Sequence, residues 1–254
     1  MSIPLDQLKD FLDYKVQEFN TSSFISDDPV SLIHRYQRKE DIEIVGFLVA
    51  TIAWGNRKAI IKSGEKLLSI MGESPFEFVM NYESPTKESN LFVHRTFNAI
   101  DLHFIFKSLR DIYEKEGMEN TFKKHPAIEG ATGRIIQFRK RFFSISHEKR
   151  TEKHVSNPEK GAAAKRLQMM LRWFCRSDGN GVDVGIWKSI SPSELNIPLD
   201  VHTANISRKL GLITRKQNDL KTLEELMLRL REFDPNDPSK YDYALFGLGA
   251  IEGF

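Results

Sequence analysis

Cysteine and long apolar runs are nearly missing from this sequence. Its 254 residues include one cysteine, Cys175, which excludes an internal disulfide, a cysteine-rich zinc site and a four-cysteine iron–sulfur cluster. A single cysteine also fits a reducing compartment. The longest apolar stretch, residues 44–54, spans 11 residues, whereas crossing a bilayer takes ~20. The N-terminal segment is amphipathic and charged, without the apolar core of a signal peptide. We therefore expect a soluble cytoplasmic protein with no membrane segment, no metal cluster and no cofactor.

The sequence also lacks internal repeats, low-complexity tracts and a convincing set of alternating strands. Apolar residues recur with helical spacing instead. The predicted helices cover 5–19, 41–54, 57–71, 99–116, 131–145, 158–176, 200–210, 219–232 and 238–247, with one more starting at Pro29 behind the cap Asp28. Residues 41–54 are apolar nearly all round, which is typical of a buried central helix; their β-branched content leaves a strand as the alternative.

These patterns predict a mainly α fold, arranged as two helical lobes around a cleft. The chain is long enough for one globular unit over 1–254 or for two closely packed lobes. In the second case we expect a first helical lobe over 40–130. The basic helices and the C-terminal helices would then form the second lobe, over 131–254. Residues 82–95 and 146–157 are expected to be loops, and 177–187 is a glycine-rich excursion.

Positive charge is concentrated in one part of the chain. The net charge is +2, but residues 134–176 contain 12 Lys or Arg and three Glu, a balance of +9. The rest of the chain, with 25 Lys or Arg and 32 Asp or Glu, carries −7. A basic segment of this kind is typical of proteins that bind polyanions, because each cation near a phosphate releases condensed counterions. The alternative is a set of solvated faces on ordinary helices.

Lys165 stands out in the helix predicted over 158–176. Ser156 and Glu159 have the spacing of a capping box at its start. The apolar stripe that must face the core consists of Leu167, Met170, Leu171 and Phe174. Lys165 lies on the opposite side of the helix, together with Arg172 and Arg176. A neutral lysine amine is a nucleophile, and nearby cations, desolvation and a helix N-terminus all favour that form. The alternative is an ordinary solvated lysine.

Asp200 is placed to cap the helix predicted over 200–210, which Gly211 ends. A capping carboxylate uses one oxygen to accept a hydrogen bond from the helix, and its second oxygen can take part in a reaction. It could accept a proton or stabilise a cationic sugar in a transition state. His202, two residues on, is a candidate proton carrier or phosphate contact, and the alternative is a surface histidine without such a role.

Three blocks resemble the helix-hairpin-helix DNA glycosylases. "IPLDVHTANISRKLGL" (197–212) is similar to the segment that carries the catalytic aspartate of that superfamily at a helix start, so Asp200, His202 and Arg208 fall on matching positions. "GAAAKRLQMMLRWF" (161–174) resembles the lysine-bearing helix of the bifunctional members, with Lys165 at the Schiff-base position. Within the superfamily, these segments resemble those of the archaeal 8-oxoguanine glycosylases.

The third block, "FLVATIAWGNRKAIIKSGEKLLSIMGESPFEF" (47–78), is similar to the first core helix of the superfamily and the polar break behind it. The resemblance implies that Asn56 and Arg57 reach into the duplex at a flipped base. The chain is also similar to a family of uncharacterised bacterial proteins that share the blocks "IPLDVHT" and "YDYALFGLG". Two departures from the superfamily matter: Ala163 replaces the second hairpin glycine, and 35 residues separate Lys165 from Asp200. Lys160 is the alternative catalytic lysine.

The resemblance implies a DNA base-excision glycosylase with abasic-site lyase activity, acting on a damaged base such as an oxidised purine and requiring no metal. Lys165 and Asp200 are the expected catalytic residues. The expected DNA contacts are Asn56, Arg57, Gly161, Arg166, Arg172, His202 and Arg208. Aromatic residues could stack on the extruded base, although such residues are more often part of the core; the candidates are Phe138, Phe142, Trp173 and Trp187. The alternatives are a non-catalytic DNA- or RNA-binding protein and a helical protein–protein adaptor.

Overall fold

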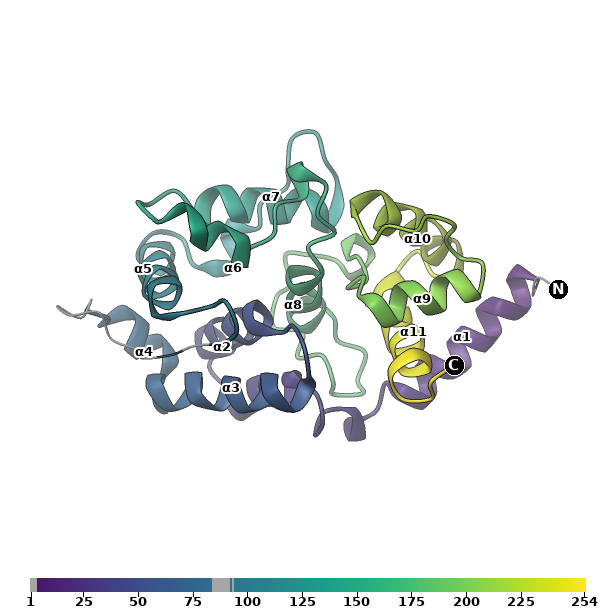
Figure 1. The fold of residues 1–254 in the computed structure, drawn as a ribbon, viewed down its shortest axis with the longest axis horizontal. Coiled ribbons are helices and arrows are strands. Elements are labelled where there is room, and N and C mark those ends of the chain that lie inside the picture. Colours follow the sequence, from purple (N-terminus) through teal and green to yellow (C-terminus); the bar gives the residue numbers. More distant parts are fainter. Residues whose placement is uncertain (1–3, 84–91, 93) are drawn as a thin grey trace. The chain divides into compact units, whose positions relative to one another are not determined.

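Helices make up the regular structure of the protein. The computed structural model describes residues 4–83, 92 and 94–254 (Figure 1). Over these residues no strand forms, apart from one isolated antiparallel bridge between His94 and Phe97. The expectation of a mainly α fold is therefore confirmed. No helix in the described part of the chain is both long and apolar enough to cross a membrane.

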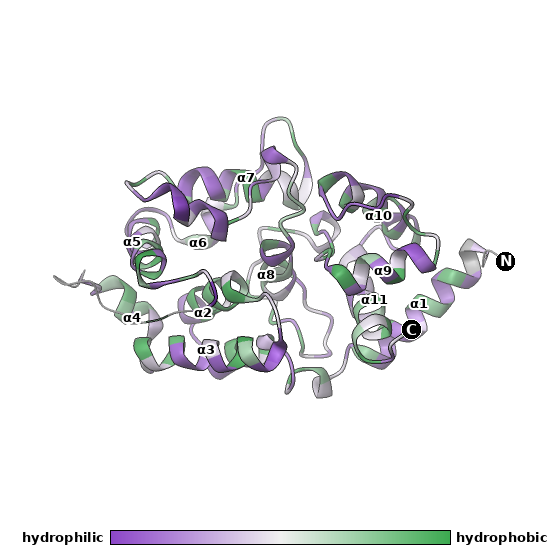
Figure 2. Ribbon diagram, viewed as in Figure 1, coloured by the Kyte–Doolittle hydropathy of each residue, from purple (hydrophilic) through white to green (hydrophobic). Residues whose placement is uncertain are grey.

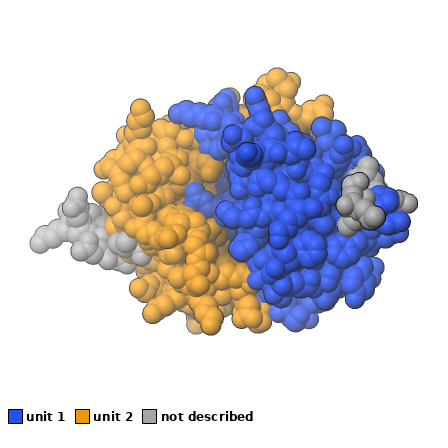
Figure 3. Space-filling view, turned by 45° about the vertical axis from the view of Figure 1, so that its right-hand side comes forward, with its two compact units in different colours: residues 1–25, 130–132, 157–254 blue, residues 26–129, 133–156 orange. Residues whose placement is uncertain are grey.

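The chain forms two compact units, which Figure 3 shows in different colours. Unit 1 contains Met1–Ile25, Gly130–Thr132 and Asn157–Phe254, and unit 2 contains Ser26–Glu129 and Gly133–Ser156. The division differs from the expected lobes at 40–130 and 131–254. The N-terminal helix joins the C-terminal helices, because α1 (Leu5–Phe19) packs against α11 (Tyr241–Ala250). Most of α7 (Gly130–Phe142), by contrast, belongs to unit 2.

Unit 2 is built around α2 (Lys39–Ile52). This helix packs on the 3-10 helix η2 (Pro29–Arg35), on α3 (Arg57–Met71) and on α4 (Pro75–Met80). Every side chain from Asp41 to Ile52 is buried, so the prediction of a central helix is confirmed and the strand alternative is wrong. Two of the three acidic residues near its start are buried, and each accepts a hydrogen bond that compensates the loss of water: Asp41 from the Phe76 amide (2.7 Å) and Glu43 from the Tyr113 hydroxyl (2.8 Å).

Packed aromatic rings fill the rest of unit 2. Phe47 of α2 meets Phe138 and Phe142 of α7 edge to face, with ring centroids 5.5 and 5.1 Å apart. Phe104 of α5 (Ala99–Lys115) packs on Phe142 in the same way. The four aromatic residues considered for base stacking are all buried, Phe138 and Phe142 in unit 2 and Trp173 and Trp187 in unit 1. Their role is packing.

Several element boundaries differ from the expected ones. The helix that starts at Pro29 is the 3-10 helix η2 rather than an α-helix. The short helices α4 and α6 (Met118–Thr121) fall outside every predicted segment. The expected loop 146–157 contains a 3-10 turn at Lys149–His154. Much of the loop expected over 82–95, namely 84–91 and 93, lies outside the described residues.

Unit 1 is organised by α11, which packs against both α1 and α9 (Val201–Lys209). α10 (Leu220–Phe233) contributes Leu223, Leu226, Met227 and Leu230 to the same apolar cluster. Figure 2 shows both hydrophobic and hydrophilic colours along α9 and α10, as expected for helices with one buried side. The cluster also includes Ala163, Leu199 and Ala204, which flank the two candidate catalytic residues in sequence.

Glycines in the "YDYALFGLG" block let α11 approach its neighbours. A Cβ on Gly247 would lie 2.2–2.5 Å from three ring atoms of Phe19, the last residue of α1. A Cβ on Gly249 would meet Ile206 at 3.0 Å and the His202 Cβ at 3.1 Å, which is tight but less severe. The first glycine is therefore required by the α1–α11 contact and the second eases the α9–α11 contact.

Replacing Gly247 by Ala is expected to lower the free energy of unfolding by about 1–3 kcal/mol, because the new methyl group overpacks against a buried ring. Urea denaturation of the variant measures this. Gly249→Ala is the matched control and should cost less. Adding Phe19→Leu to Gly247→Ala should recover part of the loss, since the ring is what the methyl group meets. Equal stability of the two single variants would contradict this account of the packing.

Candidate active site

Lys165 lies closer to its helix start than expected. The cap of the preceding turn is Asn157 rather than Ser156: its Oδ1 accepts a hydrogen bond from the Glu159 amide (3.0 Å). Only one 3-10 turn, η4 (Pro158–Lys160), follows this cap. The prediction of one continuous helix over 158–176 is therefore wrong.

Left-handed backbone separates η4 from α8 (Lys165–Cys175). Gly161 has φ 82°, and Ala164, the N-cap of α8, has φ 50°. A left-handed conformation costs a non-glycine residue about 1–2 kcal/mol, so packing around Ala164, which is buried, must offset that cost. The consequence is that Lys165 is the first residue of α8 and its side chain is only partly buried.

Asp200 caps α9 as predicted. Its Oδ1 accepts a hydrogen bond from the Thr203 amide (2.8 Å). The other end of the helix closes with a Schellman motif. The Gly211 amide donates to the Arg208 carbonyl (3.1 Å), and the Leu212 amide donates to the Ser207 carbonyl (2.8 Å). Gly211 has φ 74°, a conformation that glycine adopts readily. The second carboxylate oxygen of Asp200 takes part in no hydrogen bond or ion pair among the described residues.

The segments that carry Lys165 and Asp200 meet in one apolar cluster of unit 1. Ala163, two residues before the lysine, and Leu199, one residue before the aspartate, both belong to it. The amine and the carboxylate do not form an ion pair with each other; neither residue has an ion pair in the part of the chain that the structure describes. The fold thus brings the two segments to one core without joining the two charged groups.

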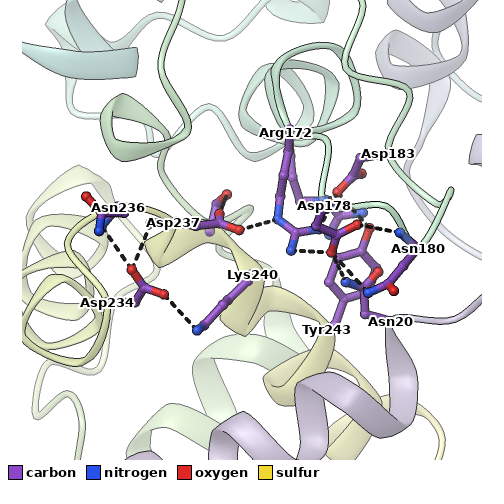
Figure 4. A network of polar contacts seen from close by, with 12 residues as sticks. Asn20, Arg172, Asp178, Asn180, Asp183, Asp234, Asn236, Asp237, Lys240 and Tyr243 are labelled. Atoms are coloured by element: carbon purple, nitrogen blue, oxygen red, sulfur yellow. Dashed lines mark hydrogen bonds and ion pairs between the residues drawn. The ribbon is translucent and has the colours of Figure 1, made fainter.

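Arg172 was expected on an open face, and this expectation is wrong. Its guanidinium is buried and pairs with Asp183 (3.2 Å) and Asp242, and it lies over the ring of Tyr243, 4.4 Å from the centroid. Arg176, one turn further, is buried with it. It pairs with Asp183 (3.1 Å) and with two further acids, Asp178 (2.7 Å) and Asp237 (2.8 Å). Figure 4 shows these three acids in one network with Arg172 and Tyr243. These arginines hold unit 1 together and are not available to a phosphate.

Asp183 is the centre of this network. It accepts hydrogen bonds from Arg172, from Arg176 and from the Tyr243 hydroxyl (2.8 Å), and its side chain is fully buried. Burial by itself lowers the pKa of Arg176, but the surrounding carboxylates, above all Asp237 and Asp183, raise it above the usual range. The charged form of the arginine is therefore the stable one.

The basic segment 134–176 is largely used inside the fold. Arg134 is buried and donates to the Phe122 carbonyl (2.8 Å). Three other arginines pair with acids: Arg139 with Glu152, Arg141 with Asp111 and Glu116, and Arg150 with Asp101. The residues of the segment without an ion pair among the described residues are Lys149, Lys153, Lys160 and Lys165. The expectation that this segment as a whole forms a basic DNA-binding face is wrong.

The other expected DNA contacts in unit 1 differ in exposure. Gly161 is exposed, and so is His202, whose ring packs edge to face on Phe246. Burial lowers the pKa of Arg166 to about 10. His202 lines a pocket of about 350 Å³ on the outer side of α9, together with Asn205, Arg208, Lys209 and Gly249 among others. This pocket is basic and accessible, whereas Arg166 is largely withdrawn from solvent.

Asn56 and Arg57 lie in unit 2, at the start of α3. Asn56 is exposed and caps the helix, its Oδ1 accepting from the Ala59 amide (3.3 Å), and Arg57 is the first helical residue. The loop before them is close to the tight turn at Arg95, because a Cβ on Gly55 would lie 2.8 Å from the Arg95 guanidinium. Arg95 is exposed and has φ 57°. Arg95 therefore places a positive charge near Asn56 and Arg57. No pattern in the sequence indicated this residue as part of the site.

A buried carboxylate, Asp101, supports this part of unit 2. It accepts hydrogen bonds from Arg150 (2.8 Å) and Thr151 (2.8 Å), and His154 Nε2 lies 3.0 Å away. The His154 ring stacks on Trp54, with 5.9 Å between centroids. Burial by itself raises the pKa of Asp101, but the hydrogen bonds, that of His154 foremost, bring it down to about 2.

Two polar groups of α8 were also missed by sequence reasoning. Gln168, one turn beyond Lys165, is 1% exposed, and both atoms of its amide lack a hydrogen-bond partner. Trp173 Nε1 is likewise buried without one. Leaving such a group unpaired costs about 1–3 kcal/mol, so a bound water or ligand group would recover stability at either place. No group of three or more His, Cys, Asp or Glu side chains among the described residues is arranged to hold a metal ion.

Comparison with known proteins places the chain in a family. A family model described as a protein of unknown function (DUF2400) matches residues 28–251. The chain belongs to the DUF2400 family. Neither the curated proteins nor the solved structures contain a match to it. The DUF2400 match includes both candidate catalytic residues and the start of α3, whereas α1 precedes the matched range.

Arg172→Gln is expected to lower the free energy of unfolding by roughly 3–5 kcal/mol, because it removes the arginine that pairs with the buried Asp242 and one of the two that pair with Asp183. Urea denaturation followed by circular dichroism measures the change. Arg229→Gln is the control: this arginine and its partner Glu232 are about half exposed (48% and 50%), and such pairs contribute at most ~1 kcal/mol. An Arg172 variant as stable as the control would show that the buried network does not support the fold.

Asp101→Asn should weaken the acid sensitivity of the protein. The folded-state pKa of Asp101 is about 2 and an unfolded aspartate titrates near 3.9. A depressed folded pKa stabilises the fold above pH ~4, and this contribution, about 2 kcal/mol, is lost as the pH falls from ~4 to ~2. The difference in unfolding free energy between wild type and variant should therefore shrink over that interval in urea titrations. A difference independent of pH would contradict the assignment.

Proposed function

We propose that this DUF2400 protein is a DNA base-excision glycosylase with abasic-site lyase activity, in which Lys165 is the nucleophile and Asp200 its carboxylate partner. The observation that carries the proposal is the placement of the two residues. Lys165 opens α8 directly behind a left-handed turn, Asp200 caps α9, and both segments are anchored in one apolar cluster. An amine and a carboxylate at helix starts are the elements that the chemistry requires.

Each position suits its role. The dipole of α8 opposes a positive charge at its first residue, which favours the neutral, nucleophilic amine. The dipole of α9 stabilises a negative charge at Asp200, and the carboxylate oxygen that does not cap the helix is available to a substrate. The strained backbone of Ala164 fixes the direction in which Lys165 leaves the turn, and strain of this kind is common at functional sites.

In the proposed reaction the damaged nucleotide first leaves the base stack, at a cost of a few kcal/mol that contacts in the site offset. The Lys165 amine then attacks the sugar C1′, forming the N–C bond as the glycosidic bond breaks and its electron pair leaves with the base. Asp200 stabilises the positive charge that develops on the sugar and accepts the proton from the amine. The C1′–O4′ bond of this adduct then breaks as Asp200 returns its proton to O4′, which opens the sugar ring and leaves an imine between C1′ and Lys165. Loss of a proton from C2′ to the Asp200 carboxylate then expels the 3′ phosphate by β-elimination.

A second candidate function is non-catalytic binding of DNA or RNA by the same helices. One observation favours it: the Lys165 amine and the Asp200 carboxylate do not pair with each other. In that case neither Lys165 nor Asp200 affects any activity, while loss of exposed cations weakens binding. The following experiment separates the two functions.

The wild-type protein should form a covalent adduct with an abasic-site duplex in the presence of borohydride, which reduces the imine. Lys165→Gln should abolish the adduct. Lys153→Gln is the control, because Lys153 is an exposed lysine of the basic segment with no ion pair among the described residues. Lys160→Gln tests the alternative nucleophile. Denaturing gel electrophoresis of labelled DNA measures the adduct. Loss of the adduct in the Lys160 variant alone would reassign the nucleophile, and no adduct in the wild type with any lesion would refute the proposal.

Asp200→Asn tests the carboxylate without disturbing the helix, since Asn caps a helix about as well as Asp. Base release from an oxidised-purine duplex should fall by at least ~10²-fold, a typical loss when a positioned charge or proton acceptor is removed. The unfolding midpoint should stay within experimental error of the wild type. A variant with full base-release activity would exclude Asp200 from the reaction.

A further inference from the structure

The glycine-rich segment 177–187 holds the only Asn–Gly dipeptide of the sequence, Asn180–Gly181. Both residues are exposed. In such a pair the main-chain nitrogen of the glycine can reach the side-chain Cγ of the asparagine and close a five-membered ring. The missing Cβ of glycine matters here, because it leaves the backbone free to rotate into the geometry of attack. The dipeptide has no part in the proposed function.

The main-chain amide of Gly181 is open to reaction. It donates no hydrogen bond among the residues that the structure describes. Gly181 has φ 76°, and a Cβ built on it would meet no atom within 4 Å. The neighbouring glycine, Gly179, has φ 85° and is equally unobstructed. The tip of this segment therefore has both the backbone freedom and the space that ring closure requires.

Asn180 is tied to the buried arginine network of unit 1. Its main-chain amide donates to Asp178 Oδ1 (3.0 Å) and its side-chain amide to Asp178 Oδ2 (3.2 Å). The same Oδ2 accepts from Arg176 (2.7 Å) and from the Asn20 side chain. Figure 4 shows Asn20 and Asn180 beside Asp178. Asp183, three residues after Asn180, is another partner of Arg176. Along the chain, Asn180 therefore lies between two acids that hold one arginine.

We propose that Asn180 undergoes spontaneous deamidation and that its products weaken the network around Arg176. The Gly181 nitrogen loses its proton to a base from solvent and attacks Asn180 Cγ, which forms an N–C bond and a cyclic imide. The Cγ–Nδ2 bond breaks, and the nitrogen takes up a proton and leaves as ammonia. Water then opens the imide. The net change is uptake of one water and release of one ammonia, so no oxidant or reductant takes part.

Two products result, and both carry a new carboxylate. Water attack at Cγ breaks the bond to the Gly181 nitrogen and leaves an aspartate in place of Asn180. Attack at the main-chain carbonyl instead leaves an isoaspartate, in which the chain continues through the side chain and is one atom longer. This chemistry involves neither DNA nor Lys165, so it is independent of the proposed function.

Either product opposes the present contacts of Asp178. The amide of Asn180 donates a hydrogen bond to this carboxylate, whereas a carboxylate in its place can only accept. Burial by itself raises the pKa of Asp178, but Arg176 brings it below the usual value, so the group is ionised. Two ionised carboxylates at hydrogen-bond distance repel each other. Asp178 or the segment around it must move, and its ion pair with Arg176 (2.7 Å) is weakened.

The first test follows the conversion itself. The protein is kept for several weeks in mildly alkaline buffer, and its tryptic peptides are then compared by mass spectrometry. Peptide 177–188 contains Asn180 and no other amide side chain, so the mass change from amide to acid identifies the site. Asn120 and Asn236 are the controls, because both are exposed and each precedes a residue with a side chain. Asn180 should convert roughly tenfold faster than either control. Equal rates would overturn the proposal.

The second test measures the effect of the new charge. Asn180→Asp reproduces one product and should lower the urea midpoint of unfolding. Asn236→Asp is the matched control, because the Asn236 amide donates to Asp234 Oδ1 (2.9 Å) in the same way, but its side chain makes no hydrogen bond among the described residues. The control should keep the wild-type midpoint. Equal midpoints for the two variants would contradict the proposed weakening of the network.

Two further comparisons separate charge repulsion from other damage. On an Asp178→Asn background, Asn180→Asp should no longer lower the midpoint, since one of the two repelling charges is gone. Aged wild-type protein should unfold at lower urea than fresh protein. Asn180→Gln should not change on ageing, because glutamine closes a larger ring and does so far more slowly. An equal loss in the aged wild type and the aged Asn180→Gln variant would assign the damage to other residues and overturn the proposal.

Discussion

The buried pairing of two arginines with Asp183 is the constraint on which unit 1 depends. α8, the glycine-rich segment behind it and α11 all contribute charges or a ring to this network, so their positions are set together. Charges taken out of water are tolerated only when nearly every donor and acceptor is matched. Because α8 is fixed at this end, its other end, which carries Lys165, has little freedom to rotate. A structural network thus determines where a chemically reactive group can point.

The two candidate catalytic residues both lie at helix starts of unit 1. Lys165 opens α8, Asp200 caps α9, and the Gly161 carbonyl before Lys165 accepts a hydrogen bond from the Leu220 amide at the start of α10. Helix starts offer unpaired amides and a favourable field for anions. A surface built from such starts suits a polyanionic ligand even though the arginine-rich segment of the chain serves packing.

Much of this could be predicted from the sequence, and the failures have identifiable causes. Helical periodicity predicted α2, α3, α9 and α10 nearly residue for residue, and "PLDVHT" predicted Asp200 as a cap. The break before Lys165 could not be seen, since Ala164 gives no local signal for a left-handed backbone that only tertiary packing sustains. The burial and pairing of Arg172 could not be predicted for another reason. Its partners Asp183 and Asp242 come from other elements, and net charge along the chain does not show which charges pair in space.

The discontinuity of unit 1 affects how the chain matures during synthesis. Unit 2 is encoded by one nearly continuous stretch, and all of it has been synthesised once residue 156 is made. Unit 1 begins with α1 and is completed only when α11 has been synthesised, some 220 residues later. At 5–20 residues per second, the apolar side of α1 waits for its partner while the intervening unit folds. In a nascent chain the side of α1 that packs on α11 therefore stays without this contact until the end of unit 1 has been synthesised.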